Sequence, residues 1–270
     1  MKINQSFSTN NQSFSTNNNV LWDSRLKPKI IVVMPAYNAE KTIRKTYEDL
    51  PKDLISEVIL VDDASKDKTA EKAKRLGITV YVHKENKGYG ANQKTCYDQA
   101  LKRNPDIVVM VHPDYQYDSK LVGILCEAIV NGRADIMLGS RIQTRHQVLT
   151  GGMPLWKYFA NRFLTLVENL SMGLNLSEYH TGFRAYSQKV LKAIPYHKFS
   201  DDFVFDQQIL ISALANDFNI SEIPVPCKYF PEASSINFMR STKYGLLTLW
   251  TVFTYLLFQL DIVKNGIFKR

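Results

Sequence analysis

Short apolar runs alternate along the first half of the chain with longer segments in which apolar residues recur every three or four positions. Continuous runs rich in β-branched residues are typical of strands that are buried on both faces of a parallel sheet. We expect such strands at 30–34, 57–61, 78–82, 107–111 and 135–138. Because a helical pattern joins each run to the next, the sequence predicts an α/β fold with a Rossmann-like, doubly wound and mostly parallel sheet.

The helical segments carry start and stop signals. Asn38 and Ser65 are each placed to cap a helix, and Gly77 is placed to end the second one. Further elements are expected as helices at 91–103, 119–130, 156–172 and 203–215, a Gly-containing turn at 181–185 and a late strand at 219–225. Pro224 and Pro226 favour the sheet edge for that strand, because proline cannot donate a ladder hydrogen bond.

Polar residues gather where the predicted strands end. The clusters are 35–38, 62–65, 83–90, 112–116 and 139–141. In a parallel sheet the carboxyl ends of the strands lie along one edge, and ligands bind there in this class of fold. The sequence therefore predicts one binding site that these segments share.

The two ends of the chain differ from its body. Residues 4–10 repeat as 11–17 in a polar, low-complexity stretch, so we expect a disordered tail over 1–25 and a main domain over 26–240. Residues 241–270 are expected to form an apolar, amphipathic C-terminal helix. Its apolar part, 244–260, is shorter than the roughly 20 residues that cross a membrane and contains polar side chains. It is expected at a membrane surface or buried in a homodimer.

Charge and cysteine content narrow the partners and the compartment. The formal net charge of +8 favours anionic partners, such as phosphates or an acidic membrane surface. No zinc-finger, basic-zipper or RNA-binding motif is present, so a nucleic-acid partner is not expected. The scattered Cys96, Cys126 and Cys227 have apolar neighbours, which indicates buried thiols in a cytosolic protein rather than disulfides or zinc ligands.

Two strand ends carry charged groups with alternative interpretations. Asp62 and Asp63 can accept hydrogen bonds from a ribose or a base, or they can simply form a turn and cap a helix. Arg141 can contact phosphate with two parallel hydrogen bonds, or it can form a surface ion pair.

The segment after the fourth predicted strand has the composition of a cation site. His112, Asp114 and Gln116 are spaced two residues apart, so a ring nitrogen and two side-chain oxygens can converge on one ion. Oxygen ligands favour magnesium or manganese, and the histidine shifts the preference toward manganese.

Six segments in order resemble the family 2 glycosyltransferases. They read IVVMPAYNAEKTI, VILVDDAS, NKGYGANQKT, MVHPDYQY, LGSR and HTGFRAYS. They are most similar to the branch that contains the dolichyl- and polyprenyl-phosphate sugar synthases, and the similarity covers residues 30–236. The resemblance implies the glycosyltransferase-A form of the fold, with 26–240 as the catalytic domain.

The resemblance also implies residue roles. Nucleotide-sugar binding would fall to Pro35, Tyr37, Asn38, Asp62, Asp63, Lys87, Gly90 and Asp114. A manganese or magnesium cofactor would be bound by His112, Asp114 and Gln116. Asp206, Asp202 and Arg141 would be catalytic, and Arg141 and Arg162 would contact phosphate of the donor or acceptor.

Three positions depart from the family pattern. His112 stands where the metal motif usually begins with an aspartate, and Gln208 replaces an acidic residue that commonly follows Asp206. Residues 231–236 replace a basic stretch that is usual in the lipid-phosphate branch. These departures leave a catalytically silent nucleotide-sugar-binding protein as the alternative function.

The implied reaction is an inverting transfer of a hexose from a nucleotide-diphosphate donor to a polyprenyl phosphate or to a cell-envelope glycan hydroxyl. A hydroxyl acceptor must lose a proton, and Asp206 is favoured over Asp202 as the base. An ionised lipid phosphate needs no base, so cations such as Arg141 would carry more of the catalysis. With a lipid carrier, the enzyme is expected to be peripheral on the inner, cytoplasmic face of the membrane.

Overall fold

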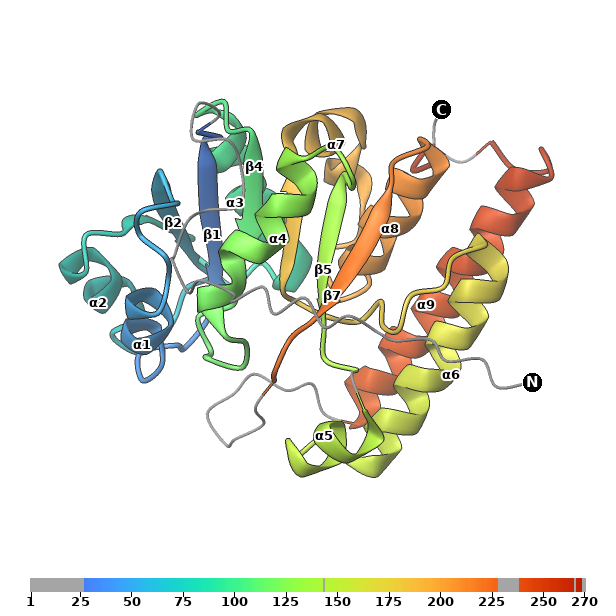
Figure 1. The fold of residues 1–270 in the computed structure, drawn as a ribbon, viewed down its shortest axis with the longest axis horizontal. Coiled ribbons are helices and arrows are strands. Elements are labelled where there is room, and N and C mark those ends of the chain that lie inside the picture. The colour runs from blue at the N-terminus through green and yellow to red at the C-terminus, as the bar shows by residue number, and fades with distance from the viewer. Residues whose placement is uncertain (1–26, 143, 228–237, 265, 269–270) are drawn as a thin grey trace, which may run out of the picture.

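A seven-stranded sheet forms the centre of the computed structural model, which describes residues 27–142, 144–227, 238–264 and 266–268 (Figure 1). The strands are β1 (Ile30–Ala36), β2 (Glu57–Asp62), β3 (Thr79–Val82), β4 (Ile107–Met110), β5 (Ile136–Ser140), β6 (Arg184–Ser187) and β7 (Ile220–Pro224). Their order across the sheet is β3-β2-β1-β4-β6-β5-β7. β6 runs antiparallel to β4 and β5, and the other pairs are parallel. The predicted α/β class and mostly parallel sheet are confirmed.

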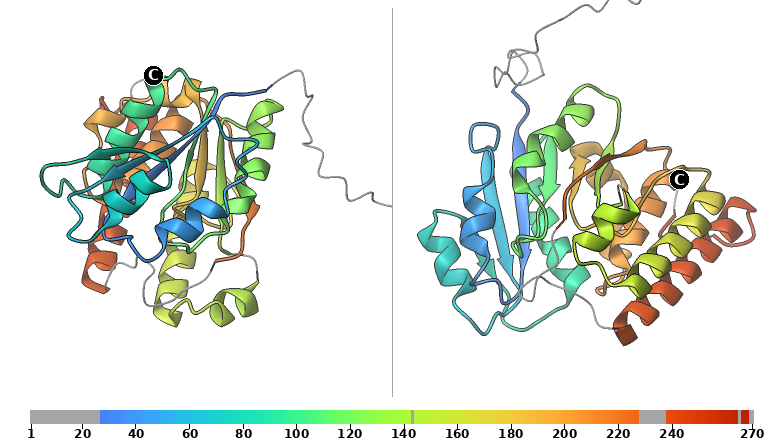
Figure 2. Two further views of the ribbon diagram at one scale, coloured as in Figure 1. Left: turned by 90° about the vertical axis from the view of Figure 1, so that its left-hand side faces the viewer. Right: turned by 60° about the horizontal axis from the view of Figure 1, so that its bottom comes forward.

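Helices cover both faces of the sheet, as the views in Figure 2 illustrate. They are α1 (Ile43–Glu48), α2 (Thr69–Arg75), α3 (Tyr89–Leu101), α4 (Val122–Val130), α5 (Arg145–Thr150), α6 (Leu155–Met172), α7 (Gln188–Ala193), α8 (Phe205–Ala215) and α9 (Phe238–Gln259). Short 3-10 helices lie at Ser119–Leu121 and Tyr196–Lys198. Buried residues of α1, α2 and α4 pack on one face, and those of α3, α7 and α8 pack on the other.

The residues of the central strand β1 are all apolar because both of its faces are buried. Successive side chains of a strand point to opposite faces, so Ile31 and Val33 join one core cluster while Ile30 and Val32 join the other. All four are fully buried. A strand covered on both faces has no position for a polar side chain, which explains why a continuous apolar run identified it from the sequence.

One strand differs from the expectation. The segment 181–185 was expected to be a turn, yet β6 begins at Arg184 and pairs with both β4 and β5. β6 is short and contains an arginine and a serine, so no apolar run marks it. All four of its residues are nevertheless buried. The late strand β7 does lie at the sheet edge, as expected.

The predicted helix caps Asn38 and Ser65 were wrong. Helices α1 and α2 begin after Thr42 and Lys68, and neither has a side-chain cap. Asn38 instead accepts a hydrogen bond from the backbone N–H of Lys66 at 2.9 Å, and Ser65 Oγ accepts one from the backbone N–H of Asn38 at 2.8 Å. These polar side chains therefore join the loops after β1 and β2 to each other, a partnership that sequence separation conceals.

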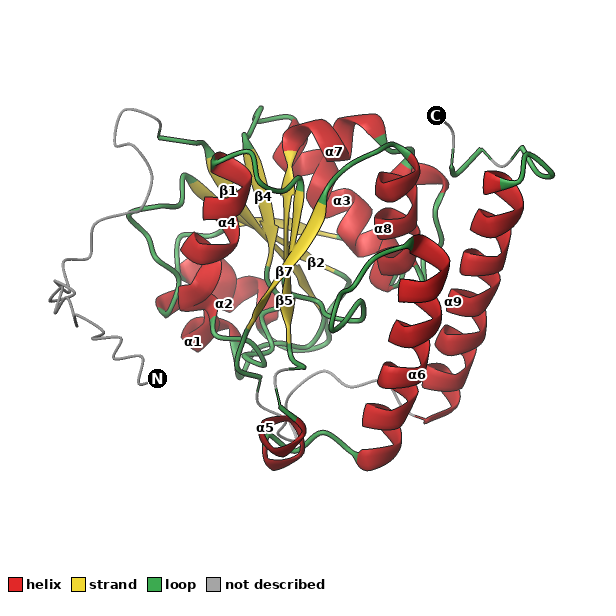
Figure 3. Ribbon diagram, turned by 45° about the vertical axis from the view of Figure 1, so that its right-hand side comes forward, coloured by secondary structure: helices red, strands yellow, loops and turns green. Residues whose placement is uncertain are grey.

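Helices α6 and α9 lie side by side along one side of the molecule (Figures 1 and 3). They run in the same direction, because Trp156 contacts Phe238 near their N-terminal ends and Leu164 faces Gly245 further along. The C-terminal helix begins at Phe238, so the expected boundary at 240 falls inside it. Across the described residues, the longest and most apolar helices still fall short of what a membrane span requires.

Two other expectations concern the chain ends and the thiols. The repeated heptapeptide and the rest of the predicted tail over 1–25 lie outside the described residues. Cys96 and Cys126 are buried free thiols, as expected, whereas Cys227 is partly exposed.

Gly90, in the first turn of α3, allows the close approach of the loop before α8. Its backbone N–H donates to the carbonyl of Asp201 at 2.7 Å. A Cβ at this position would lie 2.5 Å from the carbonyl oxygen of Ser200 and 2.9 Å from Cβ of Phe205. Since one of these atoms is backbone and the other is fixed to it, neither can move aside easily.

We therefore expect Gly90→Ala to lower the free energy of unfolding by about 1–3 kcal/mol through overpacking. Gly245→Ala is the matched control, since its Cβ meets only Leu164 at 3.7 Å and alanine favours the helix by up to about 1 kcal/mol. Urea denaturation followed by circular dichroism measures both. Equal stability of the two variants would contradict the steric argument.

Candidate active site at the carboxyl ends of the strands

Two adjoining pockets open at the carboxyl ends of β1, β2 and β4. The Lys87 pocket, about 880 Å³, is lined by residues that include Pro35, Tyr37, Asp63, Lys87, Asp202 and Lys243. The His180 pocket, about 480 Å³, is lined by residues that include Asp114, Gln116, Arg141, Lys157, His180 and Asp206. Both are lined by Tyr37, Tyr89, His112, Phe203, Arg240 and Tyr244. These shared side chains make the pockets two parts of one cleft.

The two aspartates at the end of β2 hold loops, and one of them also lines the cleft. Asp63 accepts hydrogen bonds from the backbone N–H groups of Lys87 at 2.9 Å and Gly88 at 3.0 Å, and its carboxylate lies 2.7 Å from Nδ1 of His83. It lines the Lys87 pocket, although its residue is only 3% exposed. Asp62 bonds to Ser65 and is absent from the lining of both pockets.

The predicted nucleotide-sugar residues thus divide into two groups. Pro35, Tyr37, Asp63 and Lys87 line the Lys87 pocket, and Asp114 lines the His180 pocket. Asn38, Asp62 and Gly90 line neither pocket, and they hold the surrounding loops through the contacts described above. Tyr37 is half exposed, so its ring is available to a planar ligand.

The predicted cation ligands all line the His180 pocket. Asp114 and Gln116 are buried, and Asp114 accepts a hydrogen bond from the backbone N–H of Gln116 at 3.1 Å. The His112 ring stacks on Tyr89 and packs against Gly182, whose Cβ, if it had one, would lie 2.6 Å from that ring. Burial lowers the pKa of His112, although Asp114 opposes the shift, so the imidazole is neutral at neutral pH.

The hydrogen bonds of Tyr89 indicate which nitrogen of His112 carries the proton. Tyr89 donates its hydroxyl hydrogen to Asp206 at 2.8 Å, and the same hydroxyl oxygen lies 3.1 Å from Nε2 of His112. With its hydrogen already used, Tyr89 can only accept from Nε2–H. The lone pair of the neutral ring is therefore on Nδ1.

The described residues contain no group of three or more His, Cys, Asp or Glu side chains that could hold a metal ion by themselves. A magnesium-type site commonly uses one or two carboxylates and takes its other ligands from substrate phosphates and water. The buried oxygens of Asp114 and Gln116, with the Nδ1 lone pair of His112, fit such a site.

The two candidate bases have different surroundings. Asp206 is 6% exposed and accepts hydrogen bonds from Tyr89 and from Nε2 of Gln93 at 3.0 Å; a guanidinium nitrogen of Arg184 lies 3.7 Å from its carboxylate. Asp202 lines the Lys87 pocket and pairs with Lys243 at 2.7 Å. Burial opposes ionisation of Asp202, but hydrogen bonds from Lys243 and from the backbone lower its pKa overall. Of the two candidate bases, only Asp206 is among the residues that line the His180 pocket.

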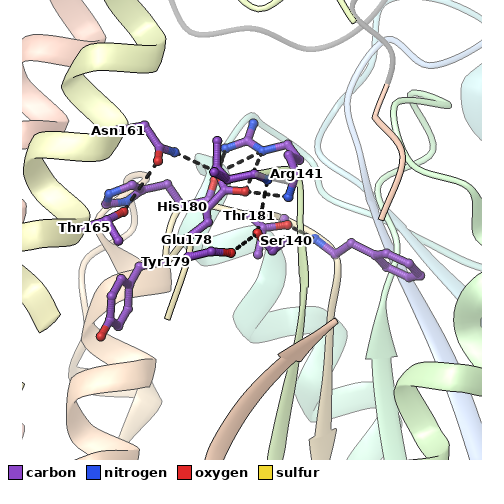
Figure 4. A network of polar contacts seen from close by, with 12 residues as sticks. Ser140, Arg141, Asn161, Thr165, Glu178, Tyr179, His180 and Thr181 are labelled. Carbon is purple, nitrogen blue, oxygen red and sulfur yellow. Dashed lines mark hydrogen bonds and ion pairs between the residues drawn. The ribbon is translucent and has the colours of Figure 1, made fainter. Parts of the chain in front are cut away.

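Arg141 lines the His180 pocket with a carboxylate behind it. Its Nε donates to Glu178 at 2.9 Å, and its Nη2 donates to the carbonyl of His180 at 2.7 Å (Figure 4). Glu178 is fully buried and also accepts a hydrogen bond from Asn161 at 2.8 Å. The predicted phosphate ligand Arg162 donates to the carbonyl of Ser177 at 2.6 Å and lines neither pocket.

Sequence reasoning missed Arg184, the largest fully buried side chain among the described residues. Its guanidinium donates to the carbonyls of Thr181 at 2.6 Å, Tyr179 at 2.9 Å and Asp206 at 2.9 Å. It thereby ties the loop before β6 to α8. An arginine is mostly exposed in proteins, so its residue type gave no signal. Only its place in the motif HTGFRAYS could have identified it.

Comparisons with known proteins agree with this architecture. Residues 31–194 match the model of the family "Glycosyl transferase family 2". The chain is 28% identical to UDP-N-acetylglucosamine--dolichyl-phosphate N-acetylglucosaminyltransferase of Methanococcus voltae, over 82% of this chain and 95% of that protein. It is 29% identical to undecaprenyl-phosphate mannosyltransferase of Micrococcus luteus, over 62% of this chain and 69% of that protein.

A solved structure shares the fold. Glucosyl-3-phosphoglycerate synthase from Mycobacterium tuberculosis, in complex with UDP, superimposes with a TM-score of 0.64 at 19% identity, over 85% of this chain and 80% of that one. The family match covers more than half of the chain and includes β1 through α7. The expected resemblance is confirmed: the chain belongs to the family 2 glycosyltransferases and has their glycosyltransferase-A fold.

Proposed function

We propose that this glycosyltransferase moves a hexose, with inversion, from a nucleoside diphosphate sugar in the Lys87 pocket to a polyprenyl phosphate that enters the His180 pocket. The observation that carries the proposal is the joined cleft. Pro35, Tyr37, Asp63 and Lys87 line one pocket. Asp114, Gln116 and Arg141 line the other, and His112 and Tyr89 line both. Donor and acceptor could therefore meet at the shared wall.

The donor side has the groups that a nucleoside diphosphate requires. Tyr37 offers an aromatic face, Asp63 a hydrogen-bond acceptor, and Lys87 a positive charge beside the strand ends. The similar synthase from Mycobacterium tuberculosis was solved as a complex with UDP. These features support a nucleotide donor without selecting its base.

Asp114 would bind a manganese or magnesium ion through its carboxylate, together with Gln116 and Nδ1 of His112. Other solved complexes of the similar synthase hold Mn²⁺ or Mg²⁺ together with UDP. Such an ion, bound to the donor diphosphate, would neutralise the charge that develops on the leaving group. The protein's contribution would be two buried side chains with oxygen ligands in the His180 pocket, together with His112, which lines both pockets.

A lipid phosphate suits the His180 pocket better than a glycan hydroxyl. Asp206 already accepts hydrogen bonds from Tyr89 and Gln93 and lies beside Arg184, so its carboxylate is held by groups that stabilise its charge. A carboxylate whose oxygens already accept these hydrogen bonds is less available to take a proton from an acceptor hydroxyl, whereas an ionised phosphate needs no base. The Methanococcus voltae and Micrococcus luteus relatives are named for dolichyl phosphate and undecaprenyl phosphate.

Helices α6 and α9 present an apolar face that we assign to the membrane surface. Its exposed residues are Leu155, Trp156, Phe159, Phe163, Leu166 and Leu170 on α6, and Phe238, Met239, Leu246, Trp250, Phe253 and Leu256 on α9. After the adjacent pair that begins each set, the spacings are three, four or seven positions, which keep the side chains on one face of each helix.

The charges on these two helices favour a lipid surface over a second copy of the chain. The charged residues are Lys157, Arg162, Arg240 and Lys243, together with Glu168, which is fully buried. Positive charges on the helices that carry an apolar face suit anionic lipids, whereas a second copy would bring like charges together. Lys157 and Arg240 also line the His180 pocket, so the face adjoins the acceptor entrance. The enzyme would then be peripheral on the inner face of the membrane.

Nucleotide titration tests the donor and cation sites. We expect calorimetry with UDP, GDP and dTDP to show tight binding of one nucleotide with Mn²⁺, weaker binding with EDTA, and loss of at least about tenfold in affinity in Asp114→Ala, consistent with one charged contact. Asp53→Ala, an exposed site away from the cleft, is the control. Nucleotide binding that EDTA does not weaken would contradict a cation in the donor site. Nucleotide binding without any sugar transfer would indicate the catalytically silent nucleotide-sugar-binding protein.

Replacing the carboxylate of Asp206 tests the acceptor class. With undecaprenyl phosphate as acceptor, we expect Asp206→Asn to keep transfer within about tenfold of the wild type per folded molecule, because a general base contributes about 10²–10⁴-fold. Its melting temperature should fall, since buried Arg184 loses a counter-charge. The control is Asp217→Asn, an exposed residue after α8. A loss of 100-fold, or efficient transfer to polyprenol itself, would favour a hydroxyl acceptor.

Vesicle flotation tests the membrane face. The chain should float with phosphatidylglycerol-containing vesicles, and Leu246→Ser with Trp250→Ser should reduce the bound fraction at unchanged melting temperature. Ile124→Ser, at an exposed apolar site on α4, should bind normally. A dimer in light scattering that the double variant converts to monomer, without any flotation, would show that a second copy covers this face.

A further inference from the structure

Two fully buried carboxylates lie behind the His180 pocket, and they differ in their partners. Glu178 accepts hydrogen bonds from Arg141 and Asn161. Glu168, on α6, has no hydrogen-bond donor aligned with either of its oxygens among the described residues. The cationic side chain within ion-pair distance is His180, whose Nε2 lies 3.2 Å from Oε2 of Glu168. An unsatisfied buried carboxylate is costly, so this contact requires an explanation.

The other nitrogen of His180 is surrounded by polar groups. Nδ1 lies 2.8 Å from the hydroxyl of Tyr244 and 2.7 Å from the side-chain nitrogen of Gln207, while Oε1 of Gln207 has no partner among the described residues. With the amide in this orientation, Nδ1 accepts and the ring proton is on Nε2. Turning the Gln207 amide, whose two ends look alike, would let its oxygen accept a hydrogen bond from Nδ1–H. A neutral ring protonated on Nδ1 has no proton on Nε2, so in this second arrangement Nε2 carries a proton beside Glu168 only if the ring is an imidazolium.

Charge decides between these arrangements. A neutral His180 would leave the buried Glu168 without a counter-charge, while an imidazolium supplies one and also satisfies the orphaned Gln207 oxygen. Burial opposes ionisation of Glu178, but Arg141, and more weakly His180, hold its pKa below the ordinary value.

The hydroxyl of Tyr244 connects this charge to the cleft. Tyr244 comes from α9 and lines both pockets, and its oxygen lies 3.1 Å from the Gln207 nitrogen as well as 2.8 Å from His180. Burial raises the pKa of Tyr244 well above its ordinary value, so the phenol remains a donor. The Nδ1–H of an imidazolium lies within hydrogen-bond distance of both the Gln207 amide and the Tyr244 hydroxyl oxygen and can be shared between them, which leaves the Tyr244 hydrogen available to a ligand in the pocket.

We propose that Glu168, His180 and Tyr244 form a positioning chain in which the buried carboxylate keeps the imidazole protonated and the imidazolium supports the Tyr244 hydroxyl as a donor to an acceptor phosphate. This inference rests on the proposed polyprenyl phosphate acceptor. Arg141, backed by Glu178, would contribute the second positive charge of the same anion subsite (Figure 4). Both cations face the pocket, and both carboxylates stand behind them.

Kinetics with undecaprenyl phosphate in detergent micelles test the chain. Tyr244→Phe and Glu168→Gln should each raise the KM for the lipid phosphate about 10–100-fold, the cost of one hydrogen bond to a charged group, with the nucleotide Kd changed less than about twofold. Tyr158→Phe, on α6 but outside both pocket linings, is the control. An unchanged lipid-phosphate KM in Tyr244→Phe would overturn the proposal.

Nitrogen NMR of the histidine ring separates this inference from the proposed function. We expect both ring nitrogens of His180 to carry protons at pH 7 in the wild type and only one to do so in Glu168→Gln, with His180→Asn providing the assignment. A neutral ring in the wild type would overturn the chain even if lipid phosphate is the acceptor. The third outcome is an imidazolium that is lost in Glu168→Gln, in a protein that transfers sugar only to hydroxyl acceptors. It would support the Glu168–His180 pair and contradict the proposed lipid-phosphate acceptor.

Discussion

The buried guanidinium of Arg184 is the interaction on which the cleft depends. It sits in β6, the strand that runs against its neighbours, so the start of β6 lies at the carboxyl ends of β4 and β5. From there it donates to carbonyls of the loop before β6 and of α8. Burial opposes its ionisation, but Asp206 keeps the pKa of Arg184 above its ordinary value. One side chain thus fixes the loop that carries His180 and the helix that carries Asp206.

The chemistry of the cleft follows from pairs of charges rather than from the net charge of the chain. Arg141 is backed by Glu178, His180 by Glu168, and His112 reaches Asp206 through Tyr89. In each case a hydrogen-bond donor or a cation lines the pocket, and a carboxylate holds that group in place. Such pairing costs desolvation energy and adds little stability, so its value is in holding polar groups where a charged ligand will bind.

The sequence predicted what depends on local pattern and missed what depends on distant partners. β1 is recognisable because both of its faces are buried, whereas β6 is too short and polar to show a period. Asn38 and Ser65 have the composition of caps, but each bonds to the other's loop. The strand-end clusters identified the cleft, yet Glu168 and Tyr244 are separated by most of the C-terminal half and carry no motif. Their partnership exists only because α6 and α9 pack together.

Helices α6 and α9 reverse the usual arrangement of an amphipathic helix. Their inward faces carry polar residues, including Thr165, Glu168, Thr248 and Thr251, all buried. Their outward faces carry the large apolar side chains. A contiguous row of large exposed apolar side chains of this kind is typical of a surface that contacts a membrane or another protein. The same arrangement brings polar donors to the interior, beside the pocket. A lipid-borne phosphate requires both features at once: an apolar surface for its chain and, one helix thickness away, buried donors for its charge.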